Sequence, residues 1–273
     1  MIGPDGHLSP GRLGRMARAP WWLLALGLAV TLFTWKAATS EVYAQILRRL
    51  LSGLGVTLAV TAVAFPLAIG LGLLAALGLV SPHPARRNLA MLYVQVARGV
   101  PILVQIFIVA FVVVHLGVEA LHWAGGSWAA VAGLRDSDVP MVARVVAALV
   151  FAYGAFEAET LRGGLTSLSR GQAEAARALG LSQRQALVRV LLPQTFRRVL
   201  PTLGNDLISL LKDSSLVSVL GVRDITQEAR LYASATFNFT ESFTLLALFY
   251  LALTLLLALG VKALEGRYRQ HAA

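Results

Sequence analysis

Charged side chains set within apolar stretches are the residues of this chain best suited to acting on a solute. The set consists of Arg98, Glu157, Glu159, Asp206, Lys212 and Asp213. An isolated charge at the centre of a bilayer costs about 2.5 to 3.5 kcal/mol on insertion scales, so a charge kept there is a functional candidate. These residues are therefore candidates for lining a path by which a polar or charged solute crosses a membrane.

Several of these positions also have a structural explanation. Glu159 lies three residues before Arg162, and such a pair on one helix face contributes only about 0.2 to 0.5 kcal/mol. Lys212 and Asp213 can neutralise each other at a break in a helix, or take part in gating. Arg98 can extend towards the cytoplasmic interface and hold its helix in place, or contact the solute.

The composition is that of a protein that crosses a membrane several times. The chain is 57% hydrophobic and only 14% charged, which excludes an ordinary soluble domain. It has no cysteine, so disulfides, thiolate nucleophiles and cysteine metal sites are excluded. No lysine follows a glycine, so a phosphate-binding G-x-x-x-x-G-K-[ST] loop is absent. We therefore predict no catalytic residue, metal ligand or cofactor site, and no ATP hydrolysis by this chain.

A polar stretch, residues 174–193, interrupts this apolar chain. Two S-x-x-Q capping boxes fall in or just before it, Ser169 with Gln172 and Ser182 with Gln185. In a capping box the two side chains satisfy free amides at the start of a helix. The spacing therefore predicts two short consecutive helices.

The junction of these two helices is predicted at Gly180. A glycine adopts the left-handed conformation that commonly ends a helix. Pro193 is expected to end or kink the second helix, because proline lacks an amide hydrogen and clashes with the preceding turn. The small residues Ala173, Ala176 and Gly180 would then lie near the junction, where another protein can approach closely; the alternative is a surface hairpin with no partner.

Six apolar stretches predict an all-α bundle of about six transmembrane spans. A bilayer core about 30 Å thick needs about 20 helical residues to cross it. The predicted spans are residues 21–35, 51–80, 88–118, 140–162, 200–222 and 242–261. The first is alternatively a cleaved signal peptide, and Pro66 is expected to kink the second. Residues 41–51 are predicted to form an amphipathic helix on the outer surface, and His115 and His122 to lie in an external loop.

The basic residues predict the orientation, because arginine and lysine are enriched in cytoplasmic segments. With the N-terminus inside, the external segments hold only Lys36, Arg48, Arg49, Arg135, Arg223 and Arg230. The cytoplasmic segments hold Arg12, Arg15, Arg18, Arg86, Arg87, Arg162, Arg170, Arg177, Arg184, Arg189, Arg197, Arg198, Lys262, Arg267 and Arg269. Both termini and the polar stretch are therefore predicted to be cytoplasmic, and the net charge of +10 is better explained by this bias than by nucleic-acid binding.

The polar stretch resembles the EAA loop of bacterial ABC-importer permeases, with Glu174-Ala175-Ala176, Gly180 and Pro193 at the loop's spacing. The flanking sequence resembles the polar-amino-acid (His/Glu/Gln/Arg/opine) subfamily. The matching elements are Arg98-Gly99-Val100-Pro101 with Gln105, Glu159 with Arg162-Gly163-Gly164, Gly171-Gln172, Leu192-Pro193-Gln194 and Lys212-Asp213-Ser214-Ser215-Leu216.

The resemblance implies a MetI-like type I importer permease in the bacterial cytoplasmic membrane. It implies two ABC ATPase subunits that bind ATP, a second permease subunit (identical or related), an extracytoplasmic substrate-binding protein and surrounding lipid, without nucleic acid. The residues that it assigns to ATPase coupling are Gln172, Glu174, Ala175, Ala176, Gly180 and Pro193. The transported solute would be a polar amino acid.

Glu157 departs from the subfamily pattern, which has an apolar residue there, and Phe156 stands where tyrosine is usual. Glu157 and Glu159 are about 200° apart around a helix, so they cannot serve one face. Glu157 either reaches the interface or pairs with a basic residue of a neighbouring helix, or it faces the translocation path. In the last case its carboxylate would favour a cationic solute such as arginine, lysine or histidine, because attraction between charges is stronger in a low dielectric.

Two other functions are compatible with the sequence. One is an ion-coupled secondary transporter in which Glu157 or Asp206 carries the ion, and the other is an ABC permease for a different small polar solute.

We divide the chain into residues 1–50 (tail, first span and external segment), 51–262 (permease domain, with the coupling loop at about 163–198) and 263–273 (cytoplasmic tail).

Overall fold

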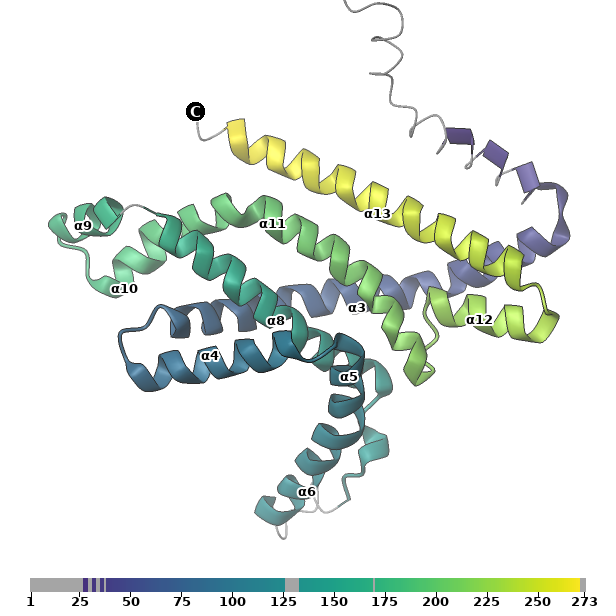
Figure 1. Ribbon diagram of the computed structural model, residues 1–273, viewed down its shortest axis with the longest axis horizontal. Coiled ribbons are helices and arrows are strands. Elements are labelled where there is room, and N and C mark those ends of the chain that lie inside the picture. Colours follow the sequence, from purple (N-terminus) through teal and green to yellow (C-terminus); the bar gives the residue numbers. More distant parts are fainter. Residues whose placement is uncertain are drawn as a thin grey trace, which may run out of the picture.

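The protein is a helical bundle built around one long helix pair (Figure 1). The computed structural model describes residues 27–28, 31–32, 35–36, 38–125, 133–168 and 170–270, and this part of the chain contains no strand. Most of the first predicted span, residues 21–35, and the basic residues before it lie outside the described residues.

The central pair consists of α3 (Glu41–Leu79) and α8 (Met141–Ser167), which pack along each other. Small residues recur every four positions on the buried face of α3, at Ala64, Ala68, Gly72 and Ala76. Small side chains let two helix backbones approach closely, which is how helices associate where lipid removes the hydrophobic driving force. α3 runs unbroken through Pro66.

Residues 41–51 were expected to form a separate surface helix. Instead they form the first turns of α3. Ile46 and Leu50 are completely buried and pack with Ile225 and Leu245. These last two residues belong to α12 (Ile225–Thr236) and α13 (Phe239–Gln270). Because nothing between residues 41 and 51 breaks a helix, the segment continues into the span and buries its apolar side against the end of the chain.

The prediction that residues 88–118 form a single helical span is wrong. α4 (Pro84–Gly99) ends before Pro101, and the chain resumes as α5 (Ile102–Phe107), a π-helix η1 (Ile108–Val113) and α6 (Val114–Gly125). Proline disfavours the helical conformation of the residue before it, and Val100 is extended, with φ −102° and ψ 132°. The side-chain amide of Gln105 donates through Nε2 to the carbonyl oxygens of Ala97 and Val100, each at 2.7 Å. It thereby satisfies two carbonyl groups that the break leaves without helical partners.

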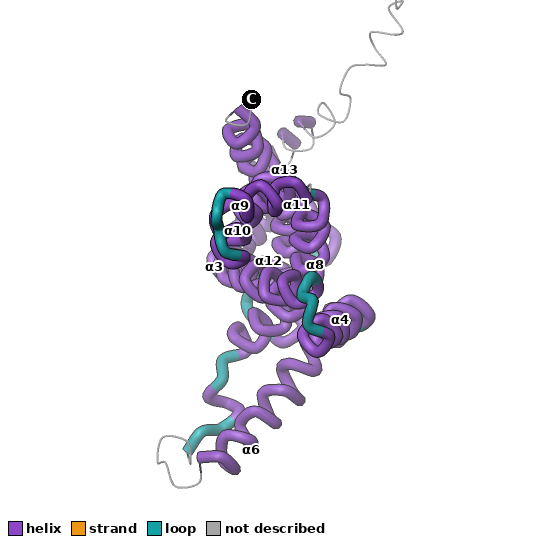
Figure 2. Tube along the Cα trace, turned by 90° about the vertical axis from the view of Figure 1, so that its left-hand side faces the viewer, coloured by secondary structure: helices purple, strands orange, loops and turns teal. Residues whose placement is uncertain are grey.

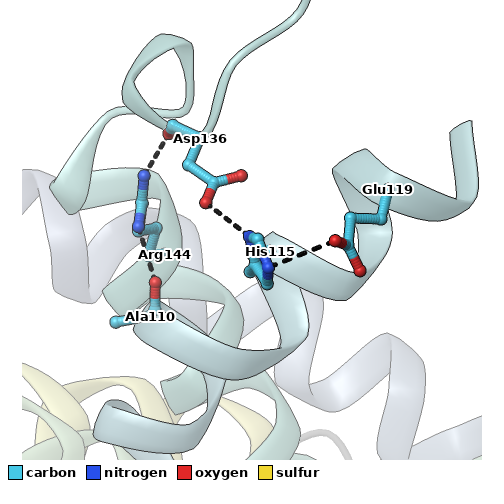
Figure 3. Close-up of polar contacts among 5 residues, drawn as sticks. All are labelled: Ala110, His115, Glu119, Asp136 and Arg144. Carbon is cyan, nitrogen blue, oxygen red and sulfur yellow. Dashed lines mark hydrogen bonds and ion pairs between the residues drawn. The ribbon is translucent and has the colours of Figure 1, made fainter. Parts of the chain in front are cut away.

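Helices α5 to α6 form an arm that leaves the bundle, at the bottom of Figure 1 and again in Figure 2. Arg144 of α8 holds the arm's base (Figure 3). Its guanidinium donates to the carbonyl oxygens of Ala110, Val139 and Asp136, the first at 2.6 Å. The 3-10 helix η2 (Asp136–Asp138) contributes a second contact, since the Asp136 carboxylate lies 2.9 Å from Nδ1 of His115.

The two histidines of this region were expected to lie in a loop, but they lie in a helix. His115 and His122 both belong to α6. The preceding apolar helix simply continues through them, because no glycine-proline or polar cluster interrupts residues 114–125.

Four of the described helices are long and apolar enough to cross a membrane: α3, residues 102–124, α8 and residues 239–266. The predicted span 200–222 is not one of them. It is divided between α11 (Leu192–Asp213) and a 3-10 helix η4 (Ser214–Leu220), which Gly221 ends with φ 75°. α11 nevertheless runs along the bundle beside α8 and α13, and supplies polar residues to its interior.

Candidate functional site

The polar stretch forms the predicted hairpin, made of α9 (Arg170–Ala178) and α10 (Gln183–Ala186) at the left-hand end of Figure 1. Gly180 adopts φ +79°, as predicted for the residue after a helix. The amides of Gly180 and Leu181 donate to the carbonyls of Arg177 and Ala176, at 2.9 and 3.1 Å. These two bonds are those of a Schellman motif, which requires a left-handed residue and therefore favours glycine.

The capping box that starts α10 is also confirmed. The Ser182 amide donates to Oε1 of Gln185 at 2.9 Å, and the Gln185 amide donates to Oγ of Ser182 at 3.3 Å. The second predicted box includes Ser169, which lies outside the described residues. Local hydrogen bonds thus shape the turn of the hairpin and the start of its second helix.

Pro193 was expected to end or kink the second helix, and it does not end it. After α10 the chain forms a π-helix, η3 (Leu187–Leu191), and Pro193 lies at the start of α11. A π-helical turn changes the hydrogen-bonding register, and proline is tolerated in the first turn of a helix because its missing amide is not needed there. The hairpin is therefore joined to α11 by continuous helical chain, which can transmit movement from one to the other.

The predicted coupling residues are divided between the surface and the inside of the hairpin. Glu174, Ala175, Gly180 and Pro193 are exposed, and so is Gln172. Oε1 of Gln172 also accepts a hydrogen bond from Gln194 at 3.3 Å, so this residue ties α9 to the start of α11.

Ala176 was expected to meet another protein but is buried inside the hairpin, as is Ala186 on the second helix. Two apolar side chains instead lie on the outer face of the hairpin, Leu179 with 82% of its surface exposed and Val188 with 52%. Neither side chain was among the predicted contact residues, although an apolar residue next to the glycine of a polar helical turn, as Leu179 is, is itself a signal.

A second group of polar residues lies inside the bundle, where α8 faces α11. Glu157 is completely buried, and neither of its carboxylate oxygens has a hydrogen-bond partner among the described residues. Asp206 of α11 lies close enough for the two charges to interact, and its own Oδ2 is buried and lacks a partner in the described part of the chain. In this conformation Glu157 therefore does not pair with a basic residue in the described part of the chain.

Tyr153 and Asp213 complete this group. We call the four residues Tyr153, Glu157, Asp206 and Asp213 the acidic cluster. The Tyr153 hydroxyl donates to Oδ2 of Asp213 at 2.7 Å. Asp213 was expected to pair with Lys212, but Lys212 is exposed, and no described residue forms an ion pair with it. The spacing of these residues could have revealed the cluster. Residues four or seven positions apart share a helix face. Tyr153 and Glu157 are four positions apart on α8, and Asp206 and Asp213 are seven positions apart on α11.

Glu159 lies on another face of α8, as predicted. It pairs with Arg162, whose Nη2 is 2.6 Å from Oε2 of the carboxylate, so its structural explanation is confirmed. Arg98 is exposed in the last turn of α4, and its guanidinium lies 5.8 Å from the ring centroid of Phe156. Among the predicted path residues, the fold thus brings Glu157 and Asp206 together, and leaves Glu159, Arg98 and Lys212 outside the cluster.

Comparison with known proteins agrees with the bundle and the hairpin. Residues 68–270 match the family of binding-protein-dependent transport system inner membrane components. The arginine transport system permease protein ArtQ of Bacillus subtilis is 31% identical, over 81% of this chain and 93% of that protein. The glutamine transport system permease protein GlnP of Escherichia coli K12 has the same identity and coverage.

Solved structures agree as well. A crystal structure of an amino acid ABC transporter with histidines has a chain that is 31% identical, with a TM-score of 0.67 over 82% of this chain and 96% of that chain. The inward-facing MetNI methionine ABC transporter shares the fold at 19% identity, with a TM-score of 0.64 over 82% of this chain and 98% of that chain. The chain belongs to the family of binding-protein-dependent transport system inner membrane components, and is a membrane-embedded, non-catalytic permease subunit of an ABC importer.

Proposed function

We propose that this permease carries a polar amino acid with a net positive charge past the acidic cluster. ATP hydrolysis in separate ATPase subunits, bound at the α9–α10 hairpin, drives the transport. Relatives with about the same identity are named for arginine and for glutamine. Their names support an amino acid as the solute but do not select between charged and neutral ones.

The observation that carries the cationic specificity is the unpaired burial of Glu157 beside Asp206. A buried carboxylate without a partner is costly, and proteins compensate by pairing it or by keeping it protonated. Two such groups side by side form a site that a cationic side chain or an α-ammonium group can satisfy. Attraction between the charges is stronger here than in water, because the surroundings have a low dielectric.

The surrounding helices explain how access to this site can change. Gly72 of α3 lies directly over Glu157 of α8, so the carboxylate has no exposed surface in this conformation. A solute can reach Glu157 only when the helices around it move apart. The hairpin continues into α11, which carries Asp206 and Asp213. A rigid-body movement of the hairpin would therefore move one wall of the acidic cluster relative to α8, which is the geometry that alternating access needs.

The proposed assembly has two permease subunits, two ATPases and an extracytoplasmic binding protein. Both termini of the permease lie in the cytoplasm. The hairpin and the α3–α4 turn lie at the same end of the bundle (Figure 1), where the ATPases would bind. The exposed residues Glu174, Leu179 and Gly180 form the proposed contact, and ATP is bound by the partner, so the permease itself needs no cofactor.

Reconstitution tests this proposal. The permease is purified with the ATPase encoded beside it, placed in vesicles with the binding protein outside and ATP inside, and supplied with single radiolabelled amino acids. We expect uptake that requires ATP and is greatest for arginine, lysine or histidine. Uptake that needs no ATPase and follows a proton or sodium gradient would contradict the proposal and favour an ion-coupled carrier.

A further inference from the structure

A groove on the outer surface of the bundle, between α3 and α4, has the shape and polarity of a lipid site. It has a volume of about 420 Å³, and we call it the hairpin-side groove. Its lining is formed by Leu71, Leu74, Ala75, Leu77, Gly78, Ser81, Arg86, Leu89, Ala90 and Tyr93. Leu74 and Leu89 each expose 70% of their surface, although both are large and apolar.

The two helices approach closely at the floor of the groove. A Cβ built on Gly78 would lie only 2.8 Å from Cβ of Ala90, so the contact tolerates nothing larger than these residues. Further along, Tyr93 turns its hydroxyl inwards and donates to the carbonyl oxygen of Phe151 at 2.8 Å. The ring of Tyr93 thus adds to the apolar wall while its polar atom is satisfied elsewhere.

The groove continues towards the other end of the bundle. A second cavity of about 790 Å³ between α3 and α8 shares Leu71 with it. Its other lining residues are Ala59, Val60, Val63, Leu67, Pro140, Val142, Ala143, Val146, Ala147, Val150 and Phe151, and none of them is polar or charged. The linings of the two cavities follow α3 from Ala59 to Gly78, and we call this stretch the apolar track. Its 19 residues of rise, at about 1.5 Å each, correspond to about 28 Å, close to the thickness of a bilayer core.

Polarity is confined to one end of this track. Among the described residues, Arg86 is the only charged one that lines either cavity, and Ser81 of the α3–α4 turn lines the same cavity as Arg86. Arg86 is exposed, and its side chain has no hydrogen bond or ion pair with any residue that the structure describes. The next residue, Arg87, lines a different pocket on the α8 side, together with Glu159 and Arg162.

We propose that an anionic phospholipid from the leaflet on the hairpin side occupies this groove. Its phosphate would lie at Arg86 and Ser81, and an acyl chain would pass between Leu74 and Leu89 towards Leu71. A basic residue at the interface end of an apolar inter-helix groove attracts anionic headgroups, and each such residue contributes a factor of about five in affinity. An anionic lipid satisfies both ends of the groove, whereas a zwitterionic lipid leaves the charge of Arg86 less well compensated. The inference depends only on the membrane location of the permease, not on which solute it carries.

Native mass spectrometry of the purified permease–ATPase complex, released from nanodiscs with equal amounts of phosphatidylglycerol and phosphatidylethanolamine, tests the proposal. We expect the wild-type complex to retain phosphatidylglycerol preferentially. Arg86→Gln should reduce the retained phosphatidylglycerol about fivefold. Arg87→Gln removes the same charge one residue away, but on the other side of α4, and should retain the lipid.

A second pair of variants tests the apolar part of the groove. Leu74→Trp should fill it and displace the lipid without changing any charge. Leu92→Trp should have no effect, because Leu92 is similarly exposed on α4, at 61%, but does not line the groove. Equal losses with Arg86→Gln and Arg87→Gln, or none with either, would overturn the proposal.

The second permease subunit is the alternative occupant of the groove, and a cross-link would show this. The chain has no native cysteine, so Leu74→Cys introduces a single thiol. Efficient cross-linking of that thiol to the partner permease in membranes would replace the lipid site with a subunit interface. Each result is read from bound lipid or from cross-linking, so it is independent of transport.

Discussion

Gly72 of α3 and Glu157 of α8 are in direct contact: a Cβ built on Gly72 would lie 2.5 Å from Cβ of Glu157 and 2.9 Å from the carbonyl oxygen of Gly154. The absence of a side chain at Gly72 is what allows α3 to pack against α8 at the base of the Glu157 side chain. The contact links the small-residue packing of the bundle to the proposed solute site, since opening the site requires these two helices to separate.

Gly72→Ala is therefore expected to destabilise the permease by about 1 to 3 kcal/mol, the usual cost of overpacking. Gly70→Ala is the matched control, because its Cβ would have no atom within 4 Å, and alanine is favoured over glycine within a helix. Thermal unfolding of the two purified variants in detergent measures the difference. Equal melting temperatures would show that α3 does not pack against Glu157 in this way.

Gly180→Asp is expected to abolish uptake while the protein remains in the membrane. The positive φ at this position costs a residue with a side chain about 1 kcal/mol or more, and the new carboxylate would project from the exposed turn that we propose contacts the ATPase. Gly266→Asp is the control, since Gly266 is exposed near the end of α13, outside the coupling loop, and a Cβ built on it would meet no described atom within 4 Å. Co-purification of the ATPase with each variant, beside uptake, checks the assignment. Normal ATPase binding and transport by Gly180→Asp would refute it.

The orientation can be tested with reporter fusions. We expect fusions at Ser127 and Asn238 to report the outside, and fusions at Pro84, Ser182 and Gln270 the inside. The fusion at Ser127 is the most informative, although this residue lies outside the described residues. A cytoplasmic signal there would reverse the bundle and place the hairpin away from any ATPase.

Arg144→Met is expected to loosen the base of the α5–α6 arm. The guanidinium is buried and donates to three backbone carbonyls, and each hydrogen bond from a charged group contributes about 1.5 to 3 kcal/mol. Faster hydrogen exchange at Ala110 and Val139, with unchanged exchange in α12, would show a local effect. Unchanged exchange at both residues would mean that Arg144 does not hold the arm.

Much of the fold follows from local patterns in the sequence. The left-handed Gly180 and the Ser182 capping box were predictable because both depend on hydrogen bonds between residues close in the chain. The break at Pro101 was missed, since hydropathy averages over it, although the effect of proline on Val100 is itself local. The π-helix before Pro193 was not predictable, because proline can end a helix or be accommodated by a change of register, and tertiary packing decides between them.

The candidate site was only partly predictable. Glu157 and Asp206 were both identified as unusual charges in apolar segments. Their meeting depends on how α8 and α11 rotate against each other, which no single-helix pattern determines. The Tyr153–Asp213 hydrogen bond shows the same limit, because Asp213 has an adjacent lysine in sequence but a tyrosine 60 residues away as its partner in space.

The most direct test of the account is the effect of Glu157→Gln on substrate preference in reconstituted vesicles, compared with Glu159→Gln. We expect Glu157→Gln to reduce the uptake of arginine and lysine about thirtyfold or more, the scale of loss when one partner of a buried charge pair is removed, while glutamine uptake and basal ATP hydrolysis are retained. Glu159→Gln should leave the preference unchanged, since Glu159 is paired with Arg162 on another face of α8. An unchanged preference for cationic over neutral amino acids in Glu157→Gln would contradict the account.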